Sequence, residues 1–235
     1  MQQTETYEAQ EVVNKVFIKG RIVTFREVNG TPMFTVVSKN GNRTIFVKMS
    51  CAKSVMPENL KNARHARVNI EGHIESYRAK RNEEGKRRIV QHFVADKIEP
   101  SKTLTDEIFG VKGKFFEEPC IRVYLKGKLT GIVEEPEWNR YNIDLSQGNL
   151  HTTVRVSQKK IDRPVEVNIG DTICALCVVN TPEKHFEEGI KRMEDILVSD
   201  LAKVSGDNAG NAFYNFKADV SDGDVKEVKF GEYEI

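Results

Sequence analysis

The chain has 235 residues, enough for one or two small domains, and a formal net charge of only +1. No apolar run approaches the ~18 residues of a membrane-spanning helix, and the polar, acidic N-terminal residues do not resemble a signal peptide. Both features argue against a membrane protein and fit a cytoplasmic one.

The small net charge conceals an uneven distribution along the chain. Residues 14–100 contain eighteen Lys and Arg against eight Asp and Glu. Residues 120–204 contain twelve against thirteen, and residues 205–235 contain three against seven. A strongly basic first half favours a nucleic-acid partner for that half.

The first part of the chain reads as a series of short strands. Residues 1–13 lack hydrophobic periodicity and are predicted to form a flexible arm. Asn29-Gly30 is a hairpin signal, because both residues tolerate positive φ. Residues 51–63 contain Pro57, lose the alternation and predict a short helix. Alternating apolar and polar residues predict three strands at 15–27, 33–38 and 44–50.

Residues 67–98 then predict two strands joined by a long basic hairpin. β-branched and aromatic residues form the stem, and six cations between residues 78 and 88 face only Glu83 and Glu84. Such a hairpin suits a protein that lies along a polyanion and stacks on its bases; the alternative is a solvated hairpin kept soluble by its charges. Three strands, a helix and two strands within residues 14–100 are the order of an OB-fold, a small Greek-key barrel.

The pattern restarts after a linker at residues 101–119, which contains a predicted helical turn at 104–109. Residues 16–23 (VFIKGRIV) align with residues 123–130 (VYLKGKLT) at an offset of 107, which also places Phe34 on Tyr141 and Ser50 on Ser157. Residues 68–70 (VNI) match 167–169 at an offset of 99, and 83–85 (EEG) match 187–189. We interpret this as a tandem duplication that gives a second OB-fold at 120–204. Gly20 and Gly127 predict a close backbone approach or bulge. Residues 205–235 predict an acidic, flexible tail.

Two sets of residues resemble those of the bacterial single-stranded DNA-binding proteins. They are Asn14-Lys15-Val16 opening a strand, and residues 68–74 (VNIEGHI) before a basic hairpin. The resemblance covers residues 12–100 well and residues 120–204 only through the repeat. It implies OB barrels that assemble in fours, here as a homodimer of two-barrel chains, with single-stranded DNA wrapped over them. Two departures stand out: the only tryptophan, Trp138, lies in the second barrel, and the acidic C-terminus ends in Glu-Tyr-Glu-Ile.

Base stacking and phosphate binding have separate candidates. The base-stacking residues are Tyr77, Phe34, Phe46, Phe93 and Trp138. The phosphate-binding residues are Arg78, Lys80, Arg81, Lys86, Arg87, Arg88, Lys19, Arg21, Arg43 and Lys48. Phe17 and Phe25 are expected in the core instead. The second hairpin, at 182–192, balances three cations against three glutamates, so we expect the second barrel to bind DNA more weakly or to mediate assembly.

No catalytic, metal or cofactor motif accompanies these residues. Cys174 and Cys177 form a lone CxxC on a predicted strand, where they point to opposite faces and are expected to be buried. The five histidines lack ligand spacing, and no phosphate loop or nucleophile elbow is present. We therefore predict a non-enzymatic, all-β protein of two tandem OB-folds with short helices, which binds single-stranded DNA with little sequence preference in replication, recombination or repair. The alternatives are a scaffold subunit of a replication or recombination complex and an RNA-binding protein. The host would be a bacterium, phage or mobile element, and the acidic tail would bind partner proteins.

Overall fold

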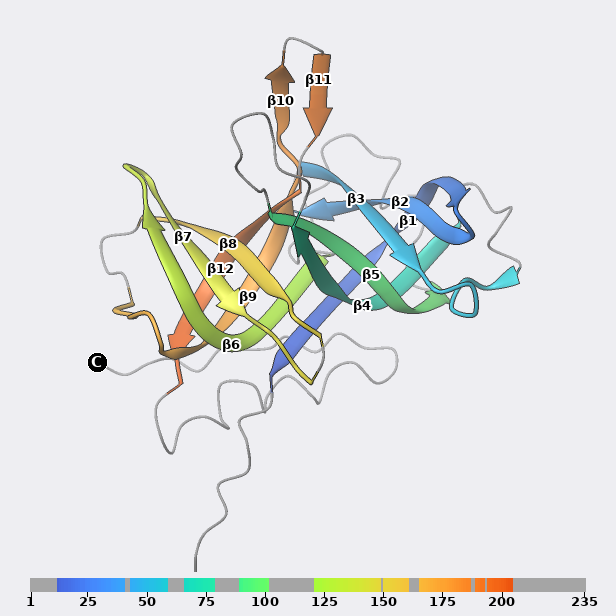
Figure 1. Cartoon of the computed structure of the whole chain (residues 1–235). Coiled ribbons are helices and arrows are strands. Elements are labelled where there is room, and N and C mark those ends of the chain that lie inside the picture. The colour runs from blue at the N-terminus through green and yellow to red at the C-terminus, as the bar shows by residue number, and fades with distance from the viewer. Residues whose placement is uncertain are drawn as a thin grey trace, which may run out of the picture.

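The computed structural model describes residues 12–40, 43–58, 66–78, 89–101, 121–148, 150–160, 165–186, 189–192 and 194–204. Within these ranges the first repeat forms a closed barrel, with strand order β1-β2-β3-β5-β4 and β4 pairing back onto β1 (Figure 1). All neighbours are antiparallel except β3 and β5. The strands are β1 Val13–Val28, β2 Thr31–Asn40, β3 Arg43–Cys51, β4 Arg67–Arg78 and β5 Ile89–Pro100.

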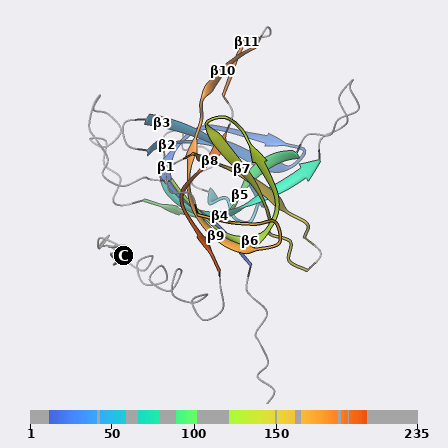
Figure 2. The same cartoon turned by 90° about the vertical axis from the view of Figure 1, so that its left-hand side faces the viewer.

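The second repeat forms a second closed barrel with the same connectivity. Its strand order is β6-β7-β8-β12-β9, with β9 pairing back onto β6 and with β8 parallel to β12. An additional hairpin, β10–β11, is inserted between β9 and β12 and projects beyond both barrels in the two views (Figures 1 and 2). The strands are β6 Ile121–Glu134, β7 Trp138–Asp144, β8 Thr153–Lys159, β9 Thr172–Asn180, β10 Glu183–Phe186, β11 Gly189–Arg192 and β12 Asp195–Lys203. The predicted all-β fold of two tandem OB barrels is confirmed.

The two barrels join through one antiparallel strand pair into a continuous sheet. Residues 13–18 of β1 pair with residues 121–126 of β6, and Val16 lies opposite Val123. These two valines occupy the same position of the repeat at the predicted offset of 107. The joint is therefore built around a pseudo-two-fold axis that passes through one pair of equivalent residues.

The strand register confirms most of the predicted repeat and corrects one part of it. In β1–β2, Phe25 pairs with Phe34, and in β6–β7 the residues 107 positions later pair in the same way. The VNI match is wrong. Gly20 pairs with Val68, whereas its counterpart Gly127 pairs with Ile173, so β4 corresponds to β9 at an offset of 105. Residues 167–169 instead enter a turn before β9, in which Ile169 is 66% exposed.

Local sequence features explain how each barrel closes. Asn29 and Gly30 adopt φ values of 50° and 79°, as the predicted hairpin turn requires. A Cβ on Gly20 would overlap the carbonyl oxygen of Val37, and one on Gly127 would overlap that of Asp144. Both glycines therefore let the next strand approach closely where the long first strand bends between two neighbours.

Alternation along the strands fills both interiors with apolar side chains. The buried residues Val16, Ile18, Ile70 and Phe93 belong to the first barrel, and the second has an equivalent set. Cys177 belongs to that core, and Cys174 on the opposite face of β9 is also buried. Burial raises the pKa of the Cys174 thiol to about 11, so both thiols are protonated at neutral pH.

Several predicted segments lie outside the described residues. The arm, linker and tail fall almost wholly there, including the helical turn expected at 104–109, and their boundaries stay predictions. Of the short helix expected at 51–63, Cys51 ends β3, residues 53–56 form a turn and a bend, and residues 59–65 lie outside the described part.

Candidate nucleic-acid interface

Tyr77 is the most exposed of the predicted stacking residues. It lies on β4, opposite Val90 of β5, at the base of the first hairpin. Its side chain is 57% exposed, so its ring has a face available to a base. The hairpin cations Lys80, Arg81, Lys86, Arg87 and Arg88 lie outside the described residues, as does the side chain of Arg78 at the end of β4.

Phe34 and Phe93 are not surface aromatics, and their assignment as stacking residues is wrong. They are 3% and 2% exposed and belong to the core. Phe34 lies opposite Met49 in the β2–β3 ladder, and Phe93 lies opposite Met49 in β3–β5 and Ile74 in β4–β5. Both rings point to the inner side of the barrel wall and have no face left for a base.

Phe46 and Trp138 lie on the outer sides of their barrels. Both are half-buried, and each neighbours a cation: Phe46 is two residues from exposed Lys48 on β3, and Trp138 lies opposite exposed Lys159 in β7–β8. An outward aromatic ring next to a cation combines the two interactions that single-stranded nucleic acid uses, base stacking and phosphate neutralisation.

The phosphate-binding candidates of the first barrel fall on two separate surfaces. Lys19 and Arg21 lie on the outer side of β1, where Arg21 is opposite Arg67 of β4. Arg43 and Lys48 are exposed on β3. The structure therefore does not gather all four candidates into one groove.

The outer side of β4–β5 carries mixed charge. His73 Nδ1 lies 3.0 Å from both carboxylate oxygens of Asp96, and His92 Nε2 lies 2.7 Å from Ser50 Oγ. Burial lowers the pKa of His92, against the opposing effects of Glu75 and Glu194. Because carboxylates repel phosphates, the middle of this ladder is a poor path for a nucleic acid, in contrast to its hairpin end.

The second barrel contains a cationic surface that sequence reasoning missed. On the outer side of β7–β8, Trp138 and Lys159 are followed by Arg140 and by exposed Arg155, which is opposite Asn142. Arg155 Nε donates to Asn142 Oδ1 at 3.2 Å, and Arg140 Nη2 donates to Glu135 Oε2 at 3.1 Å. We call Trp138, Arg140, Arg155 and Lys159 the β7–β8 face. The repeat offset of 107 aligns Arg155 with Lys48, a predicted phosphate-binding residue, and this alignment is the sequence signal for the β7–β8 face.

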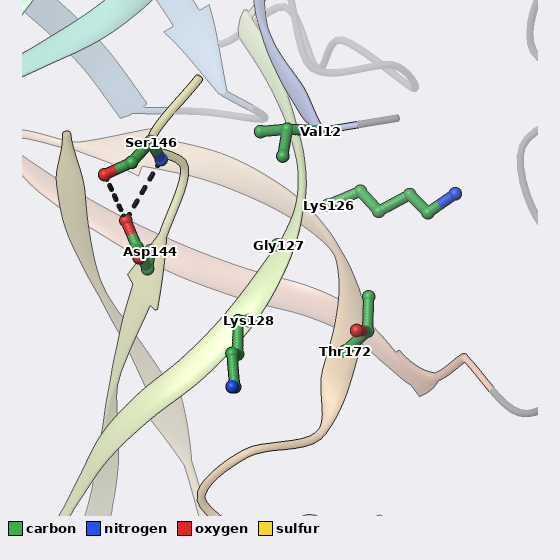
Figure 3. Close-up of a pocket in the computed structure, with 7 residues that line it drawn as sticks. All are labelled: Val12, Lys126, Gly127, Lys128, Asp144, Ser146 and Thr172. Atoms are coloured by element: carbon green, nitrogen blue, oxygen red, sulfur yellow. Dashed lines mark hydrogen bonds between the residues drawn. The ribbon is translucent and has the colours of Figure 1, made fainter. Parts of the chain in front are cut away.

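A small pocket at the joint does not add a ligand site. It has a volume of about 190 Å³, below the size of most ligand cavities. Figure 3 shows Asp144 bonded to both the N–H and the hydroxyl of Ser146, with Lys126 and Lys128 extending away from this carboxylate. The other lining residues are Val12, Gly127 and Thr172.

The described residues contain neither a membrane-spanning helix nor a cluster of metal ligands. No helix there is long and apolar enough to cross a membrane. In the same part of the chain, no three His, Cys, Asp or Glu side chains are grouped so that they could hold a metal ion.

Comparison with known proteins supports the fold. No protein-family model and no curated protein matches the sequence. Among solved structures, the chain is similar to a deletion variant of the single-stranded DNA binding protein from Thermus aquaticus, with a TM-score of 0.58 and 12% identity over 84% of this chain and 97% of that one. The wild-type protein of that organism gives a TM-score of 0.54 and 13% identity over 83% and 95% of the two chains. At such identities the likeness establishes the fold alone.

Proposed function

We propose that this chain binds single-stranded DNA with little sequence preference and protects it during replication, recombination or repair. The observation that carries the proposal is the outward-facing Trp138 beside Lys159, with Arg140 and Arg155 on the same face of an OB barrel. Aromatic stacking tolerates any base, and cations follow the backbone whatever the sequence. The exposed Tyr77 at the base of a basic hairpin supports the same mode of binding.

The comparisons support this proposal at the level of the fold. The two similar Thermus aquaticus structures are of a single-stranded DNA binding protein, and the similarity covers both barrels of this chain.

We propose binding and no catalysis, and a cytoplasmic, nucleoid-associated location. We further propose a homodimer that assembles four barrels, with the acidic residues 205–235 binding replication or recombination proteins. Light scattering coupled to gel filtration would test the dimer.

A second candidate is an interaction subunit of a replication or recombination complex. It is favoured by the β10–β11 hairpin, which projects clear of both barrels and whose sequence is nearly neutral (Figure 2). Such a hairpin could contact a protein partner, while nucleic-acid binding would be secondary. RNA binding is a variant of the first candidate, since stacking and phosphate contacts do not by themselves distinguish the sugar.

Fluorescence anisotropy of labelled oligo-dT tests the proposal directly. The full chain is titrated at several salt concentrations, with duplex DNA and an RNA oligomer as competitors. We expect tight binding that duplex does not displace, and a log–log salt slope of about 0.7 per phosphate engaged. Equal competition by duplex DNA would show that the site is only a generic basic patch. Stronger competition by the RNA oligomer would show that the ligand is RNA.

A further inference from the structure

The strand that carries Arg155 is paired unequally on its two edges. β8 pairs with β7 over its whole length, from Thr153 to Lys159. On its other edge, the described residues provide a single strand pair, between Ser157 of β8 and Leu197 of β12. The N–H groups before Ser157 that point away from β7 therefore need other acceptors, because an unsatisfied N–H at a sheet edge costs stability or pairs with another chain.

The first barrel supplies these acceptors from its own side chains. The N–H of Thr153 donates to Ser76 Oγ at 2.8 Å, and the N–H of Arg155 donates to Gln91 Oε1 at 2.7 Å. Ser76 and Gln91 lie opposite each other in the β4–β5 ladder. The edge of β8 is therefore completed by two side chains of the other barrel.

Arg155 is held by both barrels at once. Gln91 of the first barrel accepts from its backbone N–H, and Asn142 Oδ1 of the second accepts from its Nε at 3.2 Å. The Arg155 side chain is exposed and lies on the β7–β8 face, on the same outer side as Trp138. Because a guanidinium presents its donors in a rigid plane, their direction depends on where the strand places the backbone. A shift of the β8 edge would therefore move these donors relative to a phosphate on this face.

The same arrangement recurs on the other side of the pseudo-two-fold axis, where the outer side of β2–β3 is the equivalent surface of the first barrel. The N–H of Phe46 donates to Thr181 Oγ1, and the N–H of Lys48 donates to Glu194 Oε1, each at 3.2 Å. Thr181 is the counterpart of Ser76 at the offset of 105 that relates β4 to β9. Each barrel therefore places two side chains against the third strand of the other.

We infer that Ser76 and Gln91 of the first barrel are positioning residues for single-stranded DNA binding on the β7–β8 face of the second. The inference rests on the proposed function, and the two residues act through Arg155 rather than by touching DNA. By accepting the N–H groups of Thr153 and Arg155, they hold the β8 edge where the guanidinium meets a phosphate while a base stacks on Trp138. The site on the second barrel is then complete only with the first barrel docked against it.

Trp138 is the only tryptophan in the chain, so quenching of its fluorescence by short oligo-dT reports binding at this face. The full chain is titrated at several salt concentrations, and anisotropy of the labelled oligomer is recorded in parallel. The variants are Gln91→Met, which keeps the size of the side chain without its amide oxygen, Ser76→Ala, Arg155→Gln and the double variant Gln91→Met/Arg155→Gln. Urea denaturation of the same samples shows that each variant is folded.

Two further variants separate positioning from stability. Ser76→Thr keeps a hydroxyl acceptor, as Thr181 does at the counterpart position, and should bind like the unaltered chain. Thr181→Val is the matched control, because it removes the counterpart hydrogen bond and leaves both bonds to β8 in place. It should lower stability to a similar extent as Ser76→Ala, with the binding reported by Trp138 unchanged.

We expect Gln91→Met and Ser76→Ala each to weaken the binding reported by Trp138 about two- to tenfold, the net contribution of one hydrogen bond. Gln91→Met should lower the log–log salt slope by about 0.7, one phosphate, as Arg155→Gln does. The double variant should lower the slope no further, because both substitutions remove the same phosphate contact.

The inference is overturned if Gln91→Met and Ser76→Ala bind like the unaltered chain, if Gln91→Met leaves the salt slope unchanged, or if Thr181→Val weakens quenching as much as they do. Tight binding by anisotropy without quenching of Trp138 would also overturn it, since the β7–β8 face would then not be the site. Absence of oligo-dT binding by anisotropy at low salt would instead overturn the proposed function itself.

Discussion

Phe17 and Tyr124 occupy the same position of the two repeats and pack against each other across the joint. Their ring centroids are 6.0 Å apart and their planes are inclined at 75°, an edge-to-face arrangement. Phe17 lies on β1 next to Val16, and Tyr124 lies on β6 next to Val123. Equivalent residues in contact with one another are typical of a two-fold interface. The joint thus resembles a dimer interface held within one chain.

The aromatic contact at the joint should contribute measurably to stability. Tyr124 is 6% exposed, so Tyr124→Ala is expected to lower the free energy of unfolding by about 3 kcal/mol through lost burial and the cavity left behind. Tyr124→Phe keeps the ring and should cost less than half as much. Urea denaturation followed by circular dichroism measures both. A loss below about 1 kcal/mol for Tyr124→Ala would show that the joint tolerates the cavity.

Gly20 is expected to resist even the smallest substitution. In Gly20→Ala the new methyl group would overlap the backbone carbonyl of Val37, which cannot move without disturbing the β1–β2 ladder. We expect a destabilisation of about 2 kcal/mol, measured by thermal or urea unfolding. Gly131→Ala is the control, because its methyl group would meet only the side chain of Asn142. Equal effects of the two substitutions would contradict the steric explanation.

Tyr77 should affect DNA binding without affecting folding. Tyr77→Ala is expected to weaken oligo-dT binding by ~1–3 kcal/mol, the contribution of one stacked base, with an unchanged free energy of unfolding. Tyr77→Phe should retain most of the affinity. Phe93→Ala, in the core, should instead destabilise the fold by about 3–5 kcal/mol. Anisotropy and urea denaturation of the same samples separate the two roles, and normal affinity of Tyr77→Ala would remove Tyr77 from the site.

Two hydrogen bonds between the barrels should tune DNA binding at their outer surfaces in opposite directions. The N–H of Lys48 on β3 donates to Glu194 Oε1, and the N–H of Arg155 on β8 donates to Gln91 Oε1. Glu194→Gln keeps an acceptor for the N–H of Lys48 and removes a carboxylate, so binding at the β2–β3 surface should strengthen. Gln91→Glu adds a carboxylate beside Arg155 and should weaken the binding reported by Trp138. We expect changes of roughly fivefold at low salt, which 1 M salt should abolish. Changes of the same sign in both variants would contradict an electrostatic origin of the effect.

Acidification should destabilise the first barrel through His92. Burial lowers the pKa of His92 below its ordinary value near 6.5, so the unfolded chain takes up this proton first. The contribution of neutral His92 to the free energy of unfolding is fully present above the pKa that His92 has in the unfolded chain. It is lost as pH falls through that pKa towards the lower pKa of the folded chain. His92→Gln should flatten this decline between about pH 7 and 5, as measured by urea denaturation at each pH. An unchanged pH profile would show that other groups dominate.

Local chemistry explains why much of the fold could be predicted. Asn29-Gly30 makes its turn because the preference for positive φ belongs to those residues themselves. The repeat around Gly20 and Gly127 indicates two barrels, because each barrel needs a glycine where the neighbouring strand approaches closely. Alternation does not reveal which side of a strand faces inward, and the outward orientation predicted for Phe34 and Phe93 is therefore wrong. The VNI match failed because residues 167–169 enter a turn instead of a strand.

The sequence by itself determined the strands, the turns, the duplication and the placement of charge, because these follow from preferences of neighbouring residues and from composition. Only the tertiary structure decided which surfaces come together. The contact of Arg155 with Gln91 joins residues 64 positions apart, and that of Lys48 with Glu194 joins residues 146 apart. Such pairs depend on how the pseudo-two-fold joint orients two finished barrels. That orientation is set by packing at Val16, Val123, Phe17 and Tyr124, which no local pattern encodes.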